Sequence, residues 1–218
     1  MSLNIEKCFK ITFTRKNRPI ETVYKIHGTT LEQVSKIRDL GIMFDQRLTF
    51  GSHILQIVNK AKRLLGFLIR NGRKFRNTDT LKILFCTLIR PQLEFSPAIW
   101  NPTHKKEIKA IERIQKKFLK YLFYKMFTYY PTTISHSDLL QGFQMPSLES
   151  RRSVNSLLLL HDIVSGRLNA SKLSEKLQIY VPNFQARKRH IFKPNKLTKI
   201  TWKTLQLIEQ WKFTTRSN

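Results

Sequence analysis

Acidic side chains are scarce in this sequence, although nucleotidyl transfer and most nuclease reactions would need them. Such reactions use clustered Asp or Glu side chains to hold one or two magnesium ions. Asp and Glu together number 14 among 218 residues, and no two of them are adjacent. Asp39 and Asp45, which flank a predicted strand, are the nearest to a metal-binding pair. Solvated or turn positions are the simpler interpretation, and a pair assembled in three dimensions remains the alternative.

Other patterns of catalytic or metal-binding residues are missing from the sequence. The histidines are scattered and lack the i, i+4 spacing of helical metal ligands. There is no glycine-rich phosphate loop and no serine-nucleophile elbow. Cys8 and Cys86 suit neither a zinc site nor a disulfide framework, which favours a reducing compartment, nucleus or cytoplasm. We therefore expect no cofactor and no small-molecule substrate for the chain on its own.

Net charge is the strongest signal in the composition. Lys and Arg number 40 against 14 Asp and Glu, which gives +26 with neutral histidines. Self-repulsion of this size destabilises a compact chain, so a polyanionic partner is expected. DNA and RNA offer dense rows of phosphates, and an anionic membrane surface is the competing partner. No apolar run reaches the roughly 18 residues of a membrane span, and residues 1–10 lack a signal-peptide core.

Basic residues gather along predicted helices, on the side away from the apolar residues. Only Glu107 and Glu112 oppose the cations of a helix expected at about 103–124. A merely solvated face usually interleaves both signs, so this imbalance favours phosphate contact. A basic cluster in the tail is a weaker signal that also fits nuclear import. The candidates are Lys60, Arg63 and Arg70, then Lys106, Lys109, Arg113, Lys116, Lys117 and Lys120, and in the tail Arg187, Lys188 and Arg189.

Hydrophobic periodicity predicts an α+β fold that is mostly α. Alternating residues predict a half-buried strand around Phe9, Ile11 and Phe13. Further strands at 23–26 and 40–44 would complete a small antiparallel sheet. From residue 51, apolar residues recur at three- and four-residue steps. That spacing predicts helices at about 51–72, from 78 to Pro91, and at 103–124, 135–142 and 147–165, with a loosely ordered tail at 176–218 containing a short helix near 202–211.

The same pattern predicts helix ends and inward-facing residues. Ser52 is the expected N-cap of the first helix, and Gly72 is its expected stop. Pro91 should bend or end the second helix, and Ser147 should cap the last one. The residues expected to face inward are Leu81, Leu84, Phe85 and Leu88 in the second helix and Ile108, Ile111, Ile114, Phe118 and Leu122 in the third.

Aromatic residues offer a second mode of nucleic-acid contact. Bases stack on exposed aromatic rings, although a buried core position is the simpler expectation for most of them. The candidates are Trp100, Trp202, Trp211, Tyr121, Tyr124, Tyr129 and Tyr130.

Several short motifs occur in a fixed order over residues 3–165. They are Asn-Ile-Glu-Lys-Cys at 4–8, Lys-Ile-Arg-Asp-Leu-Gly-Ile at 36–42, and Leu-Ile-Arg-Pro-Gln-Leu-Glu-Phe at 88–95 with Trp-Asn-Pro at 100–102. Ile-Glu-Arg-Ile-Gln-Lys-Lys-Phe at 111–118 and Pro-Ser-Leu-Glu-Ser-Arg-Arg at 146–152 complete the order. Together they resemble the reverse transcriptases of animal non-LTR retrotransposons of the Jockey-like kind.

The resemblance implies RNA-directed DNA synthesis primed at a nick, with Mg²⁺ as the cofactor of the full-length enzyme. It divides the chain into a palm edge and primer-grip hairpin at 1–50, a helical thumb at 51–128, a helical connection at 129–175 and a basic tail at 176–218. Lys7 matches a lysine that can approach the pyrophosphate leaving group, with an ordinary surface lysine as the equal alternative. Asp39, Leu40 and Gly41 match the primer grip, which is itself a hairpin turn. Lys60, Lys62, Arg63 and Arg70 match a thumb helix that lies along the template–primer duplex.

One departure from the family changes the expected activity. The family's catalytic Asp-Asp pair and its upstream metal-binding Asp would precede residue 1, as would the fingers and most of the palm. The expectation is a C-terminal polymerase fragment that binds RNA/DNA hybrid or duplex through phosphates, with low sequence specificity and no polymerase activity alone. A domesticated, stand-alone RNA- or DNA-binding protein is the alternative. A basic membrane-surface protein ranks last, because the apolar stripes should pack on one another, and the oligomeric state stays open.

Overall fold

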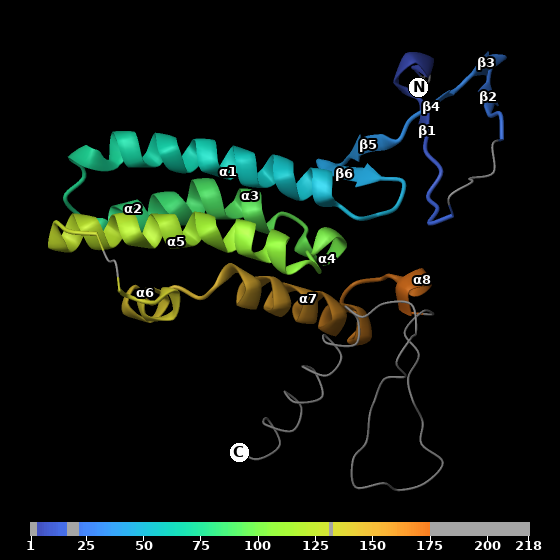
Figure 1. The fold of residues 1–218 in the computed structure, drawn as a ribbon. Helices are drawn as coiled ribbons and strands as arrows, with labels where there is room; N and C mark the ends of the chain where they lie inside the picture. The colour runs from blue at the N-terminus through green and yellow to red at the C-terminus, as the bar shows by residue number, and fades with distance from the viewer. Residues whose placement is uncertain (1–3, 17–21, 131–132, 175–218) are drawn as a thin grey trace, which may run out of the picture. The chain divides into compact units, whose positions relative to one another are not determined.

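The computed structural model describes residues 4–16, 22–130 and 133–174. In these residues the chain is mostly helical, and its short strands all precede the first long helix (Figure 1). The expected α+β fold, mostly α, is confirmed at that level. The chain forms two compact units: unit 1 is Met1–Leu93 with His104–Tyr130, and unit 2 is Glu94–Thr103 with Pro131–Asn218. The tail helix expected near 202–211 and the basic cluster Arg187–Arg189 lie outside the described residues.

The strands of unit 1 form three two-stranded sheets, so the prediction of one antiparallel sheet is wrong. A short 3₁₀ helix η1 (Ile5–Lys7) precedes them. Strand β1 (Phe9–Lys10) pairs in parallel with β4 (Glu32–Gln33). The antiparallel pairs are β2 (Lys25–Ile26) with β3 (Thr29–Thr30), and β5 (Lys36–Asp39) with β6 (Ile42–Asp45).

Burial along the first strands also differs from the expectation. Phe9 and Phe13 were expected to face a core but are 42% and 51% exposed, whereas Ile11 is half-buried. Val23 and Tyr24 are exposed as well. The physical reason is the length of the pairings, because strands of two residues offer no continuous face that a core could cover.

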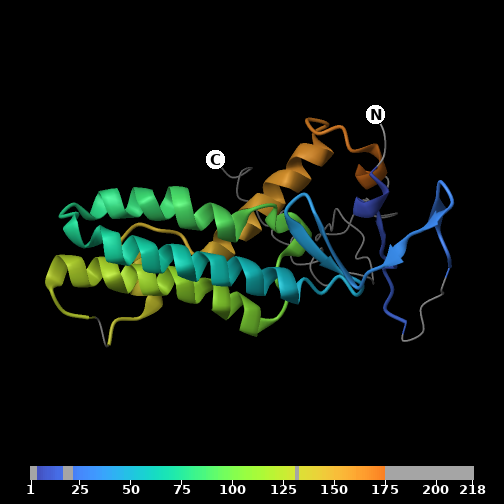
Figure 2. The same cartoon turned by 90° about the horizontal axis from the view of Figure 1, so that it is seen from above.

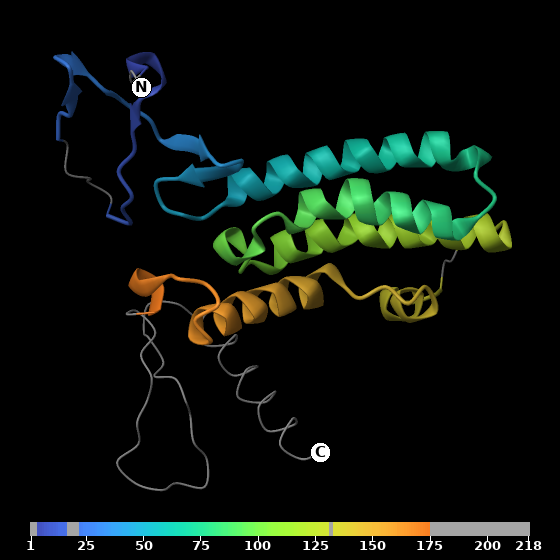
Figure 3. The ribbon, with the colours of Figure 1, turned by 180° about the vertical axis from the view of Figure 1, so that it is seen from behind.

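Three helical segments form the core of unit 1. They are α1 (Gly51–Asn71), the run α2 (Thr78–Leu84), η3 (Phe85–Ile89) and α3 (Arg90–Glu94), and α5 (Lys105–Phe127). Within unit 1, α1 contacts both η3 and α5, and α2 contacts α5; Figures 1 and 3 show these segments side by side. The rings of Phe85 and Phe118 stack between these helices, with their centroids 4.2 Å apart and an interplanar angle of 9°, and both residues are fully buried.

Helices α1 and α5 run in the same direction. At their beginnings, a Cβ placed on Gly51 would lie 3.5 Å from the Glu107 carboxylate. Near their ends, the Tyr121 hydroxyl donates to the Ile69 carbonyl at 3.4 Å. Lys125 Nζ donates to the Arg73 carbonyl at 2.9 Å, in the 3₁₀ turn η2 (Gly72–Lys74) that follows α1. The two helices are therefore in contact near both ends, and Figures 1 and 2 show them running in the same direction.

A π-helical segment changes which residues of the second helix are buried. Leu81 and Phe85 are buried as expected, but Leu88 is 45% exposed and Ile89 and Leu93 are fully buried in its place. The wider π turn of η3, closed by the Arg90 N–H to the Phe85 carbonyl, rotates the following residues relative to a regular helix. Pro91 therefore does not end the helix, which continues to Glu94.

The ends of the long helices follow local contacts that periodicity did not reveal. Ser52 is not the N-cap of α1, because the cap is Phe50, which has a left-handed backbone at φ 58°. Gly72 does end α1, but with a helical φ of −71°, so its conformation does not require glycine. Helix α5 extends to Phe127, and its buried residues include Ile111, Ile114, Phe118 and Leu122 as predicted, whereas Ile108 is half-buried.

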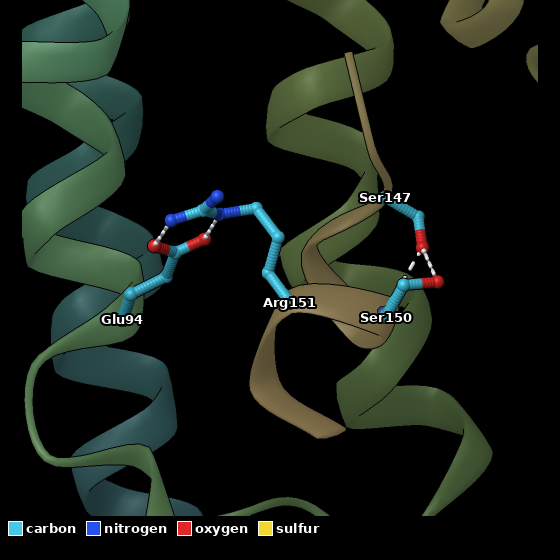
Figure 4. A network of polar contacts seen from close by, with 4 residues as sticks. All are labelled: Glu94, Ser147, Ser150 and Arg151. Atoms are coloured by element: carbon cyan, nitrogen blue, oxygen red, sulfur yellow. Dashed lines mark hydrogen bonds and ion pairs between the residues drawn. The ribbon is translucent and has the colours of Figure 1, made fainter. Parts of the chain in front are cut away.

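Unit 2 contains α4 (Pro97–Trp100), α6 (His136–Gly142), α7 (Leu148–Val164) and α8 (Ser171–Ser174). The predicted N-cap is confirmed, since Ser147 Oγ accepts the Ser150 N–H at 3.1 Å. Glu94 and Arg151 form a bidentate ion pair (Figure 4). Arg151 Nε donates to Glu94 Oε1 at 2.6 Å and Nη2 donates to Oε2 at 3.0 Å, and the Glu94 side chain is 9% exposed. Charge-assisted pairs of this geometry are strong and directional, so this pair fixes α7 to the segment that begins at Glu94.

Gly72 is expected to be required for close packing. A Cβ at this position would lie 2.8 Å from Leu81 Cδ2 and 3.3 Å from the Tyr121 hydroxyl. Both neighbours are buried, so Gly72→Ala should lower the free energy of unfolding by about 1–3 kcal/mol, as overpacking does. Gly66→Ala is the matched control, because its Cβ would meet only Arg70 at an ordinary 3.5 Å. It should stabilise the helix by about 0.5–1 kcal/mol, and denaturant unfolding of both variants distinguishes packing from helix propensity.

Candidate nucleic-acid interface

The residues Asp39, Leu40 and Gly41 lie at the tip of the β5–β6 hairpin. Asp39 pairs with Ile42, so Leu40 and Gly41 make the two-residue turn, with φ values of 44° and 88°. Turns of this kind need positive φ at both positions and usually contain Asn, Asp or Gly. Leucine is a costly choice here, and its side chain is 87% exposed. The hairpin thus holds an apolar side chain out into solvent at a strained position.

Asp39 and Asp45 do not form a metal-binding pair. Asp45 pairs with Lys36 at the other end of the hairpin from Asp39. Its carboxylate accepts hydrogen bonds from the N–H groups of Arg47, Thr49 and Phe50 and from the Thr49 hydroxyl. Partial burial alone would raise the pKa of Asp45, but these hydrogen bonds outweigh it and lower the pKa. Asp45 therefore organises the loop that leads into α1.

His53 fastens the hairpin to the first turn of α1. Its imidazole is 3% exposed, and Nδ1 accepts the backbone N–H of Met43 in β6 at 3.3 Å. An accepting nitrogen must be unprotonated. Burial, and then the positive charge of Arg38, lower the pKa of His53. The neutral imidazole is therefore the form that holds the hairpin on the helix.

Lys7 is exposed and ends the short helix η1. The 3₁₀ turn is held by the Lys7 N–H to the Asn4 carbonyl and by the Cys8 N–H to the Ile5 carbonyl. A lysine on a rigid turn can approach a phosphate, and it can equally be a solvated surface residue. Across residues 4–16, 22–130 and 133–174, no three His, Cys, Asp or Glu side chains gather as a metal site would require.

On α1, several basic residues lie beside the line that faces α5. Gly51 and Ile69 define that line, since both lie against α5. Gly72 contacts Leu81 of α2 and so marks the side facing the second helix. At about 100° per residue, the exposed residues Arg63 and Arg70 lie on the outward side, away from Gly72, and Lys62 lies between them and the line that faces α5. Lys60 lies on the side of the helix away from α5.

On α5, the outward side is found in the same way. Glu107, Tyr121 and Lys125 face α1, and Phe118 marks the side that packs on η3. At about 100° per residue, the outward side lies between the line that faces α1 and the line opposite Phe118, and it carries Lys106, Arg113, Lys117 and Lys120. Lys109 lies directly opposite Phe118, and Lys116 lies beyond it, on the side away from α1.

The outward sides of α1 and α5 form one surface, because the second helix covers the other side of the pair. We call this surface the basic face. No acidic residue occurs between Asp45 and Asp79 or between Glu112 and Asp138. At about 1.5 Å rise per residue, the α5 cations span about 21 Å, which corresponds to about six phosphates of one strand. The basic face comprises Lys62, Arg63, Arg70, Lys106, Arg113, Lys117 and Lys120.

The aromatic candidates divide between core and surface. Trp100 is 1% exposed, and its Nε1–H donates to the Phe95 carbonyl at 2.7 Å. Tyr121 is buried too, and this burial raises the pKa of its phenol. Tyr124, Tyr129 and Tyr130 are exposed. Trp202 and Trp211 lie outside the described residues.

Sequence reasoning identified the cations but missed how they combine. Periodicity separates the basic and apolar sides of a helix, yet it does not say which basic sides meet. That depends on the direction in which α1 and α5 pack. The roles of Asp45 and His53 were missed as well, because a lone Asp after a strand or a lone His near a helix start carries no sequence signal of its partners.

Comparison with known proteins supports the resemblance drawn from the motifs. The chain is similar to the probable RNA-directed DNA polymerase from transposon X-element of Drosophila melanogaster, at 26% identity over 119 residues. It is also similar to the RNA-directed DNA polymerase from mobile element jockey of Drosophila funebris, at 25% over 123 residues. These matches cover 54% and 55% of the chain. The resemblance to Jockey-like reverse transcriptases is thereby confirmed as a distant similarity.

A shorter relative matches as well. It is Uncharacterized protein B0403.1 of Caenorhabditis elegans, 26% identical over 140 residues, which are 64% of this chain and 69% of that protein. By contrast, the matched region is only 13% of the length of each of the two polymerases above. No protein-family profile and no solved structure matches the chain. None of the described helices has the length and apolar character needed to cross a bilayer.

Protonation of His53 should loosen the hairpin from α1. Because the folded pKa lies below the ordinary value of about 6.5, the neutral imidazole stabilises the fold above that value. This contribution is lost as the pH falls through the folded pKa. His53→Asn offers an acceptor oxygen near the position of Nδ1 and does not titrate. From about pH 7.5 to pH 5, the free energy of unfolding obtained from thermal unfolding should fall by about 1 kcal/mol more for the wild type than for the variant. Equal losses in both would contradict this role for His53.

Proposed function

We propose that this chain is a reverse-transcriptase fragment of the Jockey-like kind that binds template–primer nucleic acid through phosphates. The similarity to two retrotransposon polymerases supports the family. The single observation that carries the binding proposal is the basic face, where two parallel helices present cations on one surface. Neutralising phosphates there would release counterions, which is the main source of sequence-independent affinity.

The basic face suits a duplex better than a compact ligand. Its cations are spread along about 21 Å of helix, so they match a row of phosphates and do not converge on one point. Contacts to phosphates position a nucleic acid without reading its bases. The proposed ligand is therefore an RNA/DNA hybrid or duplex, bound with low sequence specificity and without a membrane.

The primer-grip and thumb assignments are part of the same proposal. The β5–β6 hairpin directly precedes α1 and is fastened to it by His53. In that assignment, the tip residues Asp39, Leu40 and Gly41 would contact the primer end while the basic face holds the duplex. Lys7 would be an accessory cation near the leaving group. The segment 51–128 would be the thumb and 129–175 a connection, with Arg187–Arg189 adding phosphate contacts from the tail.

The described residues do not fit the magnesium site of a polymerase. Two-metal phosphoryl transfer needs clustered carboxylates. Asp39 and Asp45 lie at opposite ends of their hairpin, and no larger cluster exists among the described residues. We therefore propose nucleic-acid binding without polymerase activity for this chain alone, in the nucleus or cytoplasm.

A stand-alone nucleic-acid-binding protein is the second candidate. It is favoured by the C. elegans relative, of which the matched region makes up 69%. The same basic face would serve both functions, since its contacts need no neighbouring catalytic domain.

Binding should depend steeply on salt and on the basic face. With about six phosphate contacts, the slope of log affinity against log salt should be about −5. Lys62→Ala combined with Lys117→Ala should weaken binding of an RNA/DNA hybrid and reduce that slope by about 2. Fluorescence anisotropy at several salt concentrations measures both quantities.

The matched control is Lys60→Ala combined with Lys116→Ala. It removes the same charge from the same helices, but Lys60 and Lys116 point away from the line along which α1 and α5 meet, whereas Lys62 and Lys117 lie nearer to it. The effect of the control should therefore be clearly smaller. Equal effects of the two double variants would show that only net charge matters. A flat salt response would contradict phosphate binding altogether. Tighter binding to anionic vesicles than to hybrid at the same salt would favour a membrane surface instead.

Primer extension should be undetectable with the purified chain, a primed RNA template, deoxynucleotides and Mg²⁺. The expected reason is the scattered arrangement of carboxylates in the described residues. Extension that disappears with Lys7→Ala would overturn the proposal of inactivity and would establish Lys7 as part of a working active site.

A further inference from the structure

A cluster of aromatic side chains lies at the end of α5 and just beyond it. Tyr124 and Tyr130 stack at 4.6 Å with an interplanar angle of 12°. The ring centroid of Phe123 lies 4.5 Å from that of Phe127 and 5.3 Å from that of Tyr129, which it meets edge-on. Unlike a core cluster, these rings face water: Tyr124 is 38% exposed, Phe127 49%, Tyr129 59% and Tyr130 57%.

The cluster continues the basic face. Tyr124 lies one turn beyond Lys120 and two turns beyond Lys117, on the same side of α5. Arg70 lies in the last turn of α1, and the contacts between α1 and α5 put that turn next to the end of α5. A row of cations therefore leads directly to a stacked pair of rings.

We propose that this aromatic platform, Tyr124, Phe127, Tyr129 and Tyr130, stacks on unpaired bases of a strand whose phosphates lie along the basic face. The inference rests on the proposed function and adds a second ligand feature, a single-stranded extension next to a duplex. Single strands expose the faces of their bases, whereas the bases of a duplex are already stacked on one another.

The chemistry of the platform favours this ligand over a protein or a lipid. Base–aromatic stacking tolerates any sequence, because each base has a π face, so it matches the sequence-independent contacts of the basic face. Flanking cations attract a polyanion and disfavour a basic partner. Tyrosine hydroxyls at the edge of the rings also remain hydrated while the ring faces stack.

The test compares two probes, a blunt RNA/DNA hybrid and the same hybrid with a single-stranded extension. The wild type should bind the extended probe at least about fivefold more tightly, as expected for one base–aromatic stack. Tyr124→Leu combined with Tyr130→Leu should remove this preference and leave blunt-hybrid affinity unchanged. A 2-aminopurine base in the extension should be quenched by the wild type and not by the variant. Extensions at either strand end are tested separately.

Phe67→Leu is the control for loss of an exposed aromatic ring as such, since Phe67 is 55% exposed on α1, about one turn from Arg63, and does not belong to the platform. It should keep the preference for the extended probe. No such preference in the wild type, or a preference that survives in the double tyrosine variant, would overturn the platform while blunt-hybrid binding still supports the proposed function. Failure to bind either probe would overturn the proposed function itself. Loss of anionic-vesicle binding in the tyrosine variant, with hybrid binding unchanged, would assign the rings to a lipid surface.

Discussion

The apolar stripes of α1, the second helix and α5 can be removed from water only by packing against one another, and this constraint determines the rest of unit 1. Phe85 and Phe118 stack at its centre, and Ala61, Leu65 and Leu122 are buried beside other apolar residues. Once those stripes are inside, each helix has only its basic side left for solvent. The direction of packing then decides what the basic sides can do together. Because α1 and α5 are parallel and share one covered side, their cations meet on a single outward surface.

That surface has an energetic consequence for the isolated protein. Like charges on neighbouring helices repel one another, and a net charge of +26 leaves few carboxylates to offset the repulsion. Buried apolar contacts must therefore stabilise the unit against its own electrostatics. A bound polyanion would replace repulsion by attraction, so folding stability and ligand binding are coupled. The hydrogen bonds of Asp45 and of the neutral His53 do not add to this repulsion. They hold the hairpin to α1 without placing further positive charge at the junction.

Sequence periodicity predicted the features that depend on one helix at a time. The apolar stripe of α5, the positions of α6 and α7 and the Ser147 cap all follow from residues within a few positions of one another. It failed where a distant partner or an irregular turn decides the outcome. Leu88 was expected to be buried, but the π turn before Pro91 puts Ile89 there. Ser52 looked like a cap, whereas the loop entering α1 is held by Asp45. Gly72 does end α1 as predicted, but the reason for a glycine there is the close approach of Leu81 and Tyr121, which the local sequence does not reveal.

The same distinction between local and assembled features applies to function. Phosphate binding needs only cations on a rigid surface, and such a surface persists wherever its helices fold. Phosphoryl transfer needs carboxylates brought within a few ångströms of one another, and among the described residues Asp39 and Asp45 are held at opposite ends of a hairpin. The proposed binding therefore depends on the packed helices alone, and it does not require a catalytic site beside them. The tyrosine platform extends this reasoning, because stacking on a base also requires nothing more than an exposed ring held in place. Both proposals therefore rest on features that the helices present by themselves, whereas phosphoryl transfer would need carboxylates that the described residues do not bring together.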